Sequence, residues 1–322
     1  MSIKSSVSTL ALSEAIPKGL TYLHQTQRPS GEFATYTSAR VDLAGPSPRS
    51  KSNYVTTLVI HALSCLPPDP TIASMQHQAA DFLEAERDES GTWNYDGRGE
   101  RRIPNDFDGT CCTVAALLKV GRHPPLSFYA LFWENESAPG GPYYTWLGVN
   151  DRPAGPLVRE IDLMSNANIL FCSGLLNLSL PGTVAYLTKV IEADAYQTHS
   201  IYSVSPHFLI YCLSRAYADG QVAGLGPAMP IMQKYLLTQL PPPSAEPSAF
   251  NLACLTASLF NLQADPPLIE PYLTALLTTQ QPDGGWAGWA AWRSYRPNYD
   301  GSPALTTALA VEALGKYLSR NK

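Results

Sequence analysis

The chain carries little charge and has no concentrated positive charge. Only 15% of its 322 residues are Asp, Glu, Lys or Arg, and the formal net charge is -5. The densest basic cluster is the segment 98–102, which holds three arginines. Nucleic-acid binding needs a basic stripe or patch that neutralises phosphates. We therefore expect no nucleic-acid partner.

Long hydrophobic runs are also missing, although 45% of the residues are hydrophobic. No apolar run reaches the roughly 18–20 residues that a transmembrane helix needs. The first ten residues hold one lysine and a weak apolar stretch, which does not fit a secretory signal. We expect a cytoplasmic protein without a transmembrane segment, for which peripheral contact with a membrane stays open.

Paired cysteines are absent as well, and so are strand patterns. The six cysteines contain no CxxC spacing, and most lie in apolar helical patterns: Cys65, Cys111, Cys112, Cys172, Cys212 and Cys254. This pattern indicates buried free thiols in a reducing compartment and not a disulfide framework. Period-two alternation of β-branched residues, which would predict strands, is nearly absent.

What the chain does contain is a repeated helix-turn unit. Its copies lie at residues 18–33, 80–93 and 272–286. Each copy has an amphipathic helix with an aromatic-Leu pair, then Gln or Glu, then a glycine turn and an aromatic residue. The glycine suits a helix C-terminus, and the aromatic ring can cover the helix end.

Six other segments open with small polar residues and continue as nearly all-apolar helices. They begin at Asn53, Asp106, Asp162, Tyr202, Pro247 and Ser302. Six amphipathic helices can be placed between them, near residues 8–26, 72–87, 124–136, 183–196, 228–239 and 266–280. Nearly all-apolar helices are buried on most sides, so they would form an inner ring. We predict an all-α fold, a single (α/α)6 barrel (toroid) domain over residues 1–322 with six inner and six outer helices.

The polar beginnings of the inner helices would then meet at one mouth of the barrel. This places the following residues around one cavity: Asn53, Asp106, Asp108, Asp162, Asn166, His207, Asn251 and Thr306. Asp162 and Asn166 are one helical turn apart and face the same way, which favours a role in the cavity over a plain helix cap. For His207 a structural role is the simpler interpretation, although it also stands among the candidate substrate contacts.

The segment 103–118 is the best candidate for chemistry. Asp106 and Asp108 lie at the start of a predicted apolar helix. Taken alone, they would be an acidic helix cap favoured by the helix dipole. At the mouth of a closed cavity, two adjacent carboxyls raise each other's pKa, and one of them can hold a proton for transfer.

The repeats resemble the QW motifs of the squalene-hopene cyclase and class II terpene cyclase superfamily, whose toroid also serves protein prenyltransferases. In that family the proton donor lies in a DxDD motif at the start of an inner helix. Residues 106–109 are similar to it in three of four positions, with Gly109 in place of the last Asp. The resemblance implies that Asp108 protonates an alkene or epoxide beside Asp106, in a divergent single-domain member without the usual second helical domain.

A carbocation formed in this way needs a dry cavity and electron-rich rings, each worth about 1–2 kcal/mol when desolvated. The candidate substrate contacts are Asn53, Phe107, Trp93, Tyr144, Trp146, Asn166, Tyr202, His207, Trp286, Trp289 and Tyr299. Other aromatic residues near the predicted helix mouths are Tyr95, Trp133, Tyr143, Trp292 and Tyr295. Two loops rich in Gly, Pro and aromatics, 133–146 and 285–299, are expected to roof the cavity.

The predicted function is a non-redox terpene cyclase of the isomerase or lyase type. Its general acid would be Asp108, with Asp106 and Asp162 as further catalytic candidates. Its partner would be a hydrophobic, isoprenoid-bearing small molecule. We expect no cofactor, with Mg²⁺ a candidate only if the substrate carries a diphosphate. Arginines that could bind such a group are Arg101, Arg102, Arg159, Arg293 and Arg296.

Three alternatives stay open. The first is a non-catalytic protein that binds an isoprenoid or another hydrophobic ligand. The second is a zinc-dependent, prenyltransferase-like enzyme with ligands from Asp108, Cys111, Cys112 and either His61 or His207, although this spacing fits no strong zinc signature. The third is a sugar-active enzyme on an α/α barrel, which would also use two carboxylates. Substrate length, head group, product and oligomeric state stay open too.

Overall fold

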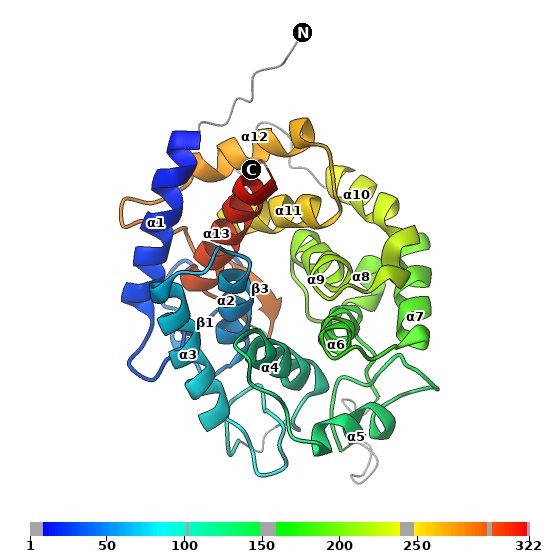
Figure 1. Cartoon of the computed structure of the whole chain (residues 1–322). Coiled ribbons are helices and arrows are strands. Elements are labelled where there is room, and N and C mark those ends of the chain that lie inside the picture. Colours follow the sequence, from blue (N-terminus) through cyan, green and yellow to red (C-terminus); the bar gives the residue numbers. More distant parts are fainter. Residues whose placement is uncertain (1–8, 101–102, 149–158, 239–247, 295–297, 321–322) are drawn as a thin grey trace.

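The computed structural model describes residues 9–100, 103–148, 159–238, 248–294 and 298–320. Within these residues, two concentric rings of helices form a toroid (Figure 1). The inner ring consists of α2 (Tyr54–Ser64), α4 (Phe107–Lys119), α6 (Leu163–Leu175), α9 (Pro206–Ala218), α11 (Ala249–Asn261) and α13 (Pro303–Arg320). Each inner helix packs on the next, and α13 packs on α2, so the ring closes. The predicted helical toroid is therefore present.

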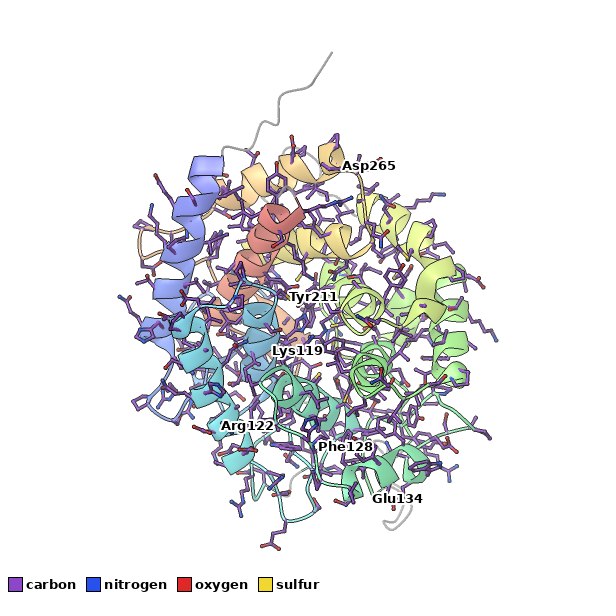
Figure 2. All side chains as sticks on the ribbon, viewed as in Figure 1. Lys119, Arg122, Phe128, Glu134, Tyr211 and Asp265 are labelled. Atoms are coloured by element: carbon purple, nitrogen blue, oxygen red, sulfur yellow. The ribbon has the colours of Figure 1, made fainter. Side chains whose placement is uncertain are left out.

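The outer ring consists of α1 (Thr9–Thr26), α3 (Pro70–Ala85), α5 (Ser127–Glu134), α7 (Pro181–Glu192), α10 (Met229–Thr238) and α12 (Pro266–Thr278). Two short elements, α8 (Tyr196–His199) and the 3-10 helix η1 (Ala223–Ala228), lie between them in sequence. Side chains fill the centre of the ring, with Tyr211 among them, whereas Glu134 and Asp265 lie at the outer edge (Figure 2). Among the described helices, none is long and apolar enough to span a membrane.

Burial separates the two kinds of helix as their sequences predict. In α2 every residue from Tyr54 to Leu63 is buried, whereas in α3 the buried residues follow one face only. The small polar residues that open the inner helices act as N-caps. The side chains of Asp106, Asp162, Ser205 and Ser248 each accept a hydrogen bond from the backbone N–H three residues on. Each such cap contributes about 1 kcal/mol to stability.

The repeated unit ties three outer helices, α1, α3 and α12, to the inner helices that follow them. The indole Nε1 of Trp93 donates to the Leu83 carbonyl (2.7 Å), which covers the end of α3. The backbone N–H of Trp93 donates to Thr110 Oγ1 in α4 (3.1 Å). The third copy repeats both bonds, from Trp286 Nε1 to a carbonyl of α12 and from the Trp286 N–H to a threonine of α13.

The glutamine of the repeat joins neighbouring outer helices. Gln27 Nε2 donates to the Met75 carbonyl in α3 (2.8 Å). In the third copy Gln280, and not the expected Gln281, donates to the Ala15 carbonyl in α1 (2.9 Å). This last bond closes the outer ring between α12 and α1.

The chain is not purely helical, which corrects the all-α expectation. A small antiparallel sheet has the strand order β2-β1-β4-β3, with β1 at Thr35–Ser38, β2 at Arg49–Ser50, β3 at Ala290–Arg293 and β4 at Tyr299–Gly301. The central pairing joins Tyr36 to Gly301, so the segment after α1 meets the segment before α13. These strands have two to four residues, too few for an alternating pattern to be visible in the sequence.

Candidate active site

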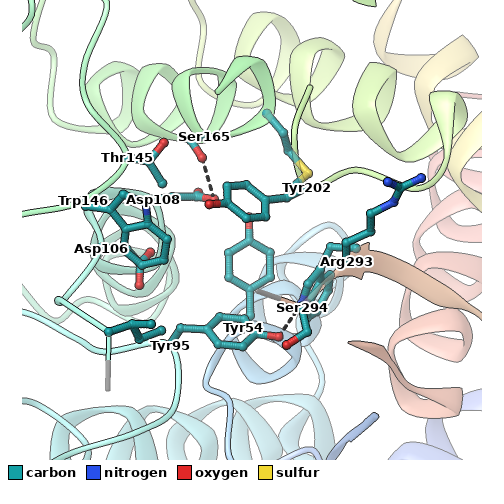
Figure 3. Close-up of a pocket in the computed structure, with 13 residues that line it drawn as sticks. Tyr54, Tyr95, Asp106, Asp108, Thr145, Trp146, Ser165, Tyr202, Arg293 and Ser294 are labelled. Atoms are coloured by element: carbon teal, nitrogen blue, oxygen red, sulfur yellow. Dashed lines mark hydrogen bonds between the residues drawn. The ribbon is translucent and has the colours of Figure 1, made fainter. Parts of the chain in front are cut away.

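A cavity lies at the N-terminal ends of α2, α4 and α6, beside strand β3 (Figure 3). Its volume is about 50 Å³, and it is partly open to solvent. Its lining combines two carboxyls with aromatic rings: Tyr54, Tyr95, Ile103, Asp106, Asp108, Thr145, Trp146, Met164, Ser165, Tyr202, Trp292, Arg293 and Ser294. Both loops that were expected to roof the cavity contribute residues to it.

Asp108 is fixed in the cavity wall by residues from three helices. Its Oδ1 accepts a hydrogen bond from Asn168 Nδ2 (2.9 Å) and its Oδ2 one from Ser165 Oγ (3.3 Å), both in α6. The Tyr54 hydroxyl in α2 donates to Oδ2 (3.2 Å), and Cys112 Sγ lies 3.6 Å from Oδ1. Burial raises the pKa of Asp108, and these hydrogen bonds partly oppose the rise.

Asp106 is the second carboxyl of the pair. It caps α4, where its Oδ1 accepts the Gly109 N–H. Its Oδ2 is buried and has no hydrogen-bond partner among the described residues. Burial, followed by repulsion from Asp108, raises the pKa of Asp106 to about 7. The pair can therefore retain one proton near neutral pH, which a proton donor requires.

Gly109 gives Asp106 the space for this arrangement. A Cβ atom at position 109 would lie 2.7 Å from Asp106 Oδ1 and 3.1 Å from Oδ2. A residue with a side chain would thus push the Asp106 carboxyl away from the N–H that it accepts. Asp108 is instead held by Tyr54, Ser165 and Asn168, three side chains from neighbouring helices.

A buried arginine orients the amide that holds Asp108. Arg215 Nη2 in α9 donates to Asn168 Oδ1 (2.6 Å), so the Asn168 amino group must face Asp108. Arg215 is 2% exposed, and its guanidinium lies 4.4 Å from the centre of the Phe171 ring. Arg215 is not among the residues predicted from the sequence, although a lone arginine in a mostly apolar helix is a visible signal.

Another part of the wall is held by one carboxylate, Glu160. Trp146 Nε1 and Tyr202 Oη both donate to Glu160 Oε2, at 2.8 and 2.6 Å. The segment before Trp146 is also fixed to the start of α4, because the Phe107 N–H donates to the Thr145 carbonyl (2.7 Å). The two rings lie edge to face, 6.4 Å apart, and both line the cavity as expected.

Asp162 and Asn166 are placed differently from the sequence expectation. Both are fully buried and neither lines the cavity. The Asp162 carboxylate accepts the N–H groups of Ser165 (2.8 Å) and Ile201 (2.6 Å). The Asn166 amide bonds to both the N–H and the carbonyl of Tyr143. These side chains tie two loops to the start of α6, and neither contacts Asp108 as a supporting partner.

Most of the other predicted contacts also lie outside the cavity lining. Those that do not line it are Asn53, Trp93, Phe107, Tyr144, His207, Trp286, Trp289 and Tyr299. Phe107 packs instead against Phe132 (5.1 Å) and Tyr143 (5.5 Å). His207 is buried, and burial lowers its pKa to about 4. Arg101, Arg102, Tyr295 and Arg296 lie outside the described residues, Arg159 is exposed, and Arg293 lines the cavity.

The residues that the structure adds lie in the first two turns of α2 and α6. Tyr54, Met164, Ser165 and Asn168 were not predicted as site residues, although each is within two residues of one that was. Polar residues at the start of a helix predict which helical turn faces the cavity. They predict less reliably which side chain of that turn lines it. Tyr95 and Trp292, which the sequence analysis had noted only as aromatic residues near helix mouths, also line the cavity.

A second polar cluster lies away from this cavity, near the C-terminal ends of α2 and α9. Within the described residues, His61, Cys65, Asp219 and Glu312 are close enough to one another to hold a metal ion. The Lys316 Nζ lies 2.9 Å from Glu312 and 3.1 Å from Asp219, so it already balances their charge. Asp108, Cys111 and Cys112, which the zinc alternative invoked, are not part of this cluster.

Comparison with known proteins gives a match only at the level of structure. No protein-family model matches the sequence, and neither does any curated protein. The type II terpene cyclase MstE from Scytonema superposes with a TM-score of 0.70 at 17% sequence identity, over 96% of this chain and 99% of that one. The same cyclase with geranylgeranyl dihydroxybenzoate, its substrate, matches with a TM-score of 0.66 at 17% identity, over 95% of this chain and 97% of that one.

An ent-copalyl diphosphate synthase from Streptomyces platensis matches with a TM-score of 0.54 at 15% identity, over 84% of this chain and 51% of that one. These similarities establish the fold. The chain has the fold of the type II terpene cyclases, the fold that the sequence resemblance implied.

Proposed function

We propose that the protein is a class II terpene cyclase that protonates an isoprenoid or isoprenoid-bearing substrate with Asp108 as the general acid. The observation that carries this proposal is the setting of Asp108. It lies in the wall of an aromatic-lined cavity, beside a second carboxyl, with one amide and two hydroxyls bonded to it. Burial and the neighbouring acid favour retention of a proton, and the rings favour a cation.

The reaction would begin with transfer of the Asp108 proton to one carbon of a terminal C=C bond. The alkene electron pair forms the new C–H bond, and the other carbon becomes a tertiary cation. The next C=C bond attacks this cation, which closes a ring and moves the charge along the chain. Tyr54, Trp146, Tyr202 and Trp292 present their rings to this path, and each desolvated contact stabilises the cation by about 1–2 kcal/mol.

The aromatic lining of the cavity and the structural neighbours support the proposed substrate class. MstE binds geranylgeranyl dihydroxybenzoate as substrate and merosterolic acid A as product. We infer a prenyl chain in the aromatic part of this cavity and a polar head group at Arg293, which is exposed and lines the cavity. Proton transfer of this kind needs no cofactor, and Mg²⁺ would be a candidate only for a diphosphate head group.

We also propose that the whole chain is one (α/α)6 barrel domain, with the small sheet as an addition beside the cavity. In this proposal its partner is a hydrophobic small molecule and not a nucleic acid. The low content of positive charge supports the exclusion of nucleic acid. The free cysteines of the described chain are consistent with a reducing compartment such as the cytoplasm.

The test is Asp108→Asn, assayed with geranylgeranyl dihydroxybenzoate and geranylgeranyl diphosphate as probes. We expect the wild type to cyclise at least one probe, and the variant to bind it with unchanged affinity and form no product. Asp283→Asn, which changes an exposed acid outside the cavity, is the matched control and should keep full activity. Cyclisation by Asp108→Asn would refute the assignment, and binding without turnover by the wild type would favour the non-catalytic alternative.

A further inference from the structure

Another buried carboxyl, that of Asp300, lies behind the cavity wall. Asp300 in β4 is 1% exposed and does not itself line the cavity. Its Oδ2 accepts a hydrogen bond from Tyr95 Oη (2.5 Å), and its Oδ1 accepts one from the Thr37 hydroxyl. Tyr95 does line the cavity. The phenol of Tyr95 therefore connects the cavity to Asp300.

The direction of the hydrogen bond between Tyr95 and Asp300 is defined. Trp292 Nε1, which can only donate, lies 2.5 Å from Tyr95 Oη. The Tyr95 oxygen thus accepts one N–H and gives its own proton to Asp300. The Ser52 hydroxyl also bonds the Tyr95 oxygen, so a proton that arrives from the cavity must displace this bond.

Asp300 and Asp108 differ in their access to the cavity. Asp108 lines the cavity, whereas Asp300 does not line it and is reached through Tyr95. Burial raises the pKa of both carboxyls, and hydrogen bonds oppose the rise in each. For Asp300 the nearby Asp96 adds to the rise. A carboxylate with a raised pKa is a stronger base than an exposed one, so Asp300 is suited to take the proton that Tyr95 passes on.

Both carboxyls bond a tyrosine, and the two tyrosines meet at one tryptophan. Tyr54 bonds Asp108 and packs edge to face against Trp292, with ring centres 4.8 Å apart. Tyr95 bonds Asp300 and accepts the Trp292 N–H. In the view of Figure 3, Asp108 and Ser165 lie toward one side of the cavity and Tyr95 toward the other. A substrate chain that cyclises between these two sides would have Asp108 near one end and Tyr95 near the other end.

We propose that Tyr95 and Asp300 form the base that ends the reaction, an inference that rests on the proposed cyclisation. In this step a C–H bond next to the final cation breaks, and its electron pair forms a C=C bond that neutralises the cation. The proton goes to Tyr95 Oη while the phenolic proton passes to Asp300 Oδ2. Asp108 has lost one proton and Asp300 has gained one, so the net charge of the protein is unchanged. Exchange with water restores both groups between turnovers.

The assignment predicts the class of product. Deprotonation at carbon gives a cyclic alkene, whereas capture of the same cation by water gives an alcohol. Because Tyr95 touches the reacting carbon in this proposal and Asp300 acts through Tyr95, Tyr95 is the catalytic residue and Asp300 receives its proton. Removal of either group should redirect the final cation without preventing the first protonation.

The experiment compares Tyr95→Phe and Asp300→Asn with the wild type on geranylgeranyl dihydroxybenzoate. Mass distinguishes alcohols from alkenes, and chromatography separates the isomeric alkenes. We expect both variants to consume substrate while the ratio of alcohols and isomeric alkenes to the main alkene rises at least about tenfold. Tyr95→Phe keeps the ring and its packing, so it stays informative if Asp300→Asn fails to fold. Asp283→Asn, which changes an exposed acid outside the cavity and the relay, should keep the wild-type ratio.

A purely structural role for the pair would lower the melting temperature and the rate while leaving the product ratio unchanged, and that outcome would overturn the inference. A failure of the proposed function can be distinguished from a failure of this inference. If Asp108→Asn still forms product, or if the wild type turns over no prenylated probe, the cyclase assignment fails and the inference fails with it. If Asp108→Asn is inactive and Tyr95→Phe keeps the wild-type ratio, the inference alone is wrong.

Discussion

Asn168 Nδ2 lies 2.9 Å from Asp108 Oδ1, and the Asn168 carbonyl oxygen is occupied by Arg215. The amide therefore cannot rotate without losing the bond to a buried charge. The Asn168 amino group is therefore a donor to Asp108 with a fixed direction, whereas the hydroxyl donors of Tyr54 and Ser165 can rotate. The charge that forms on Asp108 after proton transfer is thus met by a donor already in place.

The first prediction concerns this donor. Asn168→Leu should lower kcat about 10-fold to 100-fold, because the carboxylate left by proton transfer loses its fixed hydrogen bond. Steady-state kinetics would measure the effect. Asn261→Leu removes a buried asparagine that bonds Ser214 and Lys316, away from the cavity, and is the control for loss of a buried amide. Equal losses of kcat in both variants would show that the effect is structural.

The second prediction is a dependence of stability on pH through Asp106. Its pKa is raised from 3.8 to about 7, so between these values the folded chain holds a proton that the unfolded chain releases. Stability from this group is complete below pH 4 and is lost as the pH rises toward 7. Asp106→Asn keeps a capping side chain and removes the titration.

The difference in unfolding free energy between Asp106→Asn and the wild type should therefore grow in favour of the variant as the pH rises from about 4 to 7. One unit of pKa shift corresponds to about 1.4 kcal/mol. Denaturant titrations at several pH values measure this difference. A difference that stays constant over this range would contradict a protonated Asp106 in the folded protein.

The third prediction separates activity from stability at Gly109. Gly109→Ala should raise helix stability by up to about 1 kcal/mol, because alanine is the better helix former. It should also displace the Asp106 carboxyl, which a Cβ would approach to 2.7 Å, and so lower activity. Because the displaced cap costs about as much stability as alanine adds to the helix, we expect a nearly unchanged melting temperature together with a slower reaction. Gly226→Ala, where the nearest atom is 4.0 Å away, is the matched control.

The fourth prediction concerns the head group. Arg293→Met should raise KM about 10-fold to 100-fold for a prenyl substrate with an anionic head, since a hydrogen bond to a charged group contributes about 1.5–3 kcal/mol. The KM of a neutral prenyl alcohol should not change. Arg159→Met, at an exposed arginine that does not line the cavity, should leave both values unchanged. An equal rise in KM for charged and neutral substrates would argue against a head-group contact.

The helical part of the fold could be predicted because the inner helices are apolar over nearly their whole length. A run such as Phe107–Lys119 leaves no other way to bury its side chains. The sheet could not be predicted, because Tyr36 pairs with Gly301, which lies 265 residues further on. Strands this short take their stability from a distant partner and leave no local pattern.

The site was predictable only as far as polar residues at helix starts reveal it. This pattern identified Asp106 and Asp108. It also pointed to Asp162, whose two carboxylate oxygens each accept a hydrogen bond from a backbone N–H group. Whether a helix-opening acid serves its own cap or a cavity depends on contacts far away in sequence. Asn168 is 60 residues from Asp108 and 47 from Arg215, so their network appears only in the folded chain.

The bond from Gln280 to the Ala15 carbonyl bridges 265 positions in sequence and closes the outer ring. The packing of α1 on α13 and the pairing of β1 with β4 span similar separations. Loop-closure entropy makes such distant contacts slow to form. The early helices of a growing chain must therefore wait, with apolar faces uncovered, until the last helix has left the ribosome. Synthesis of this ring would then depend on protection of those faces for nearly the full time of translation.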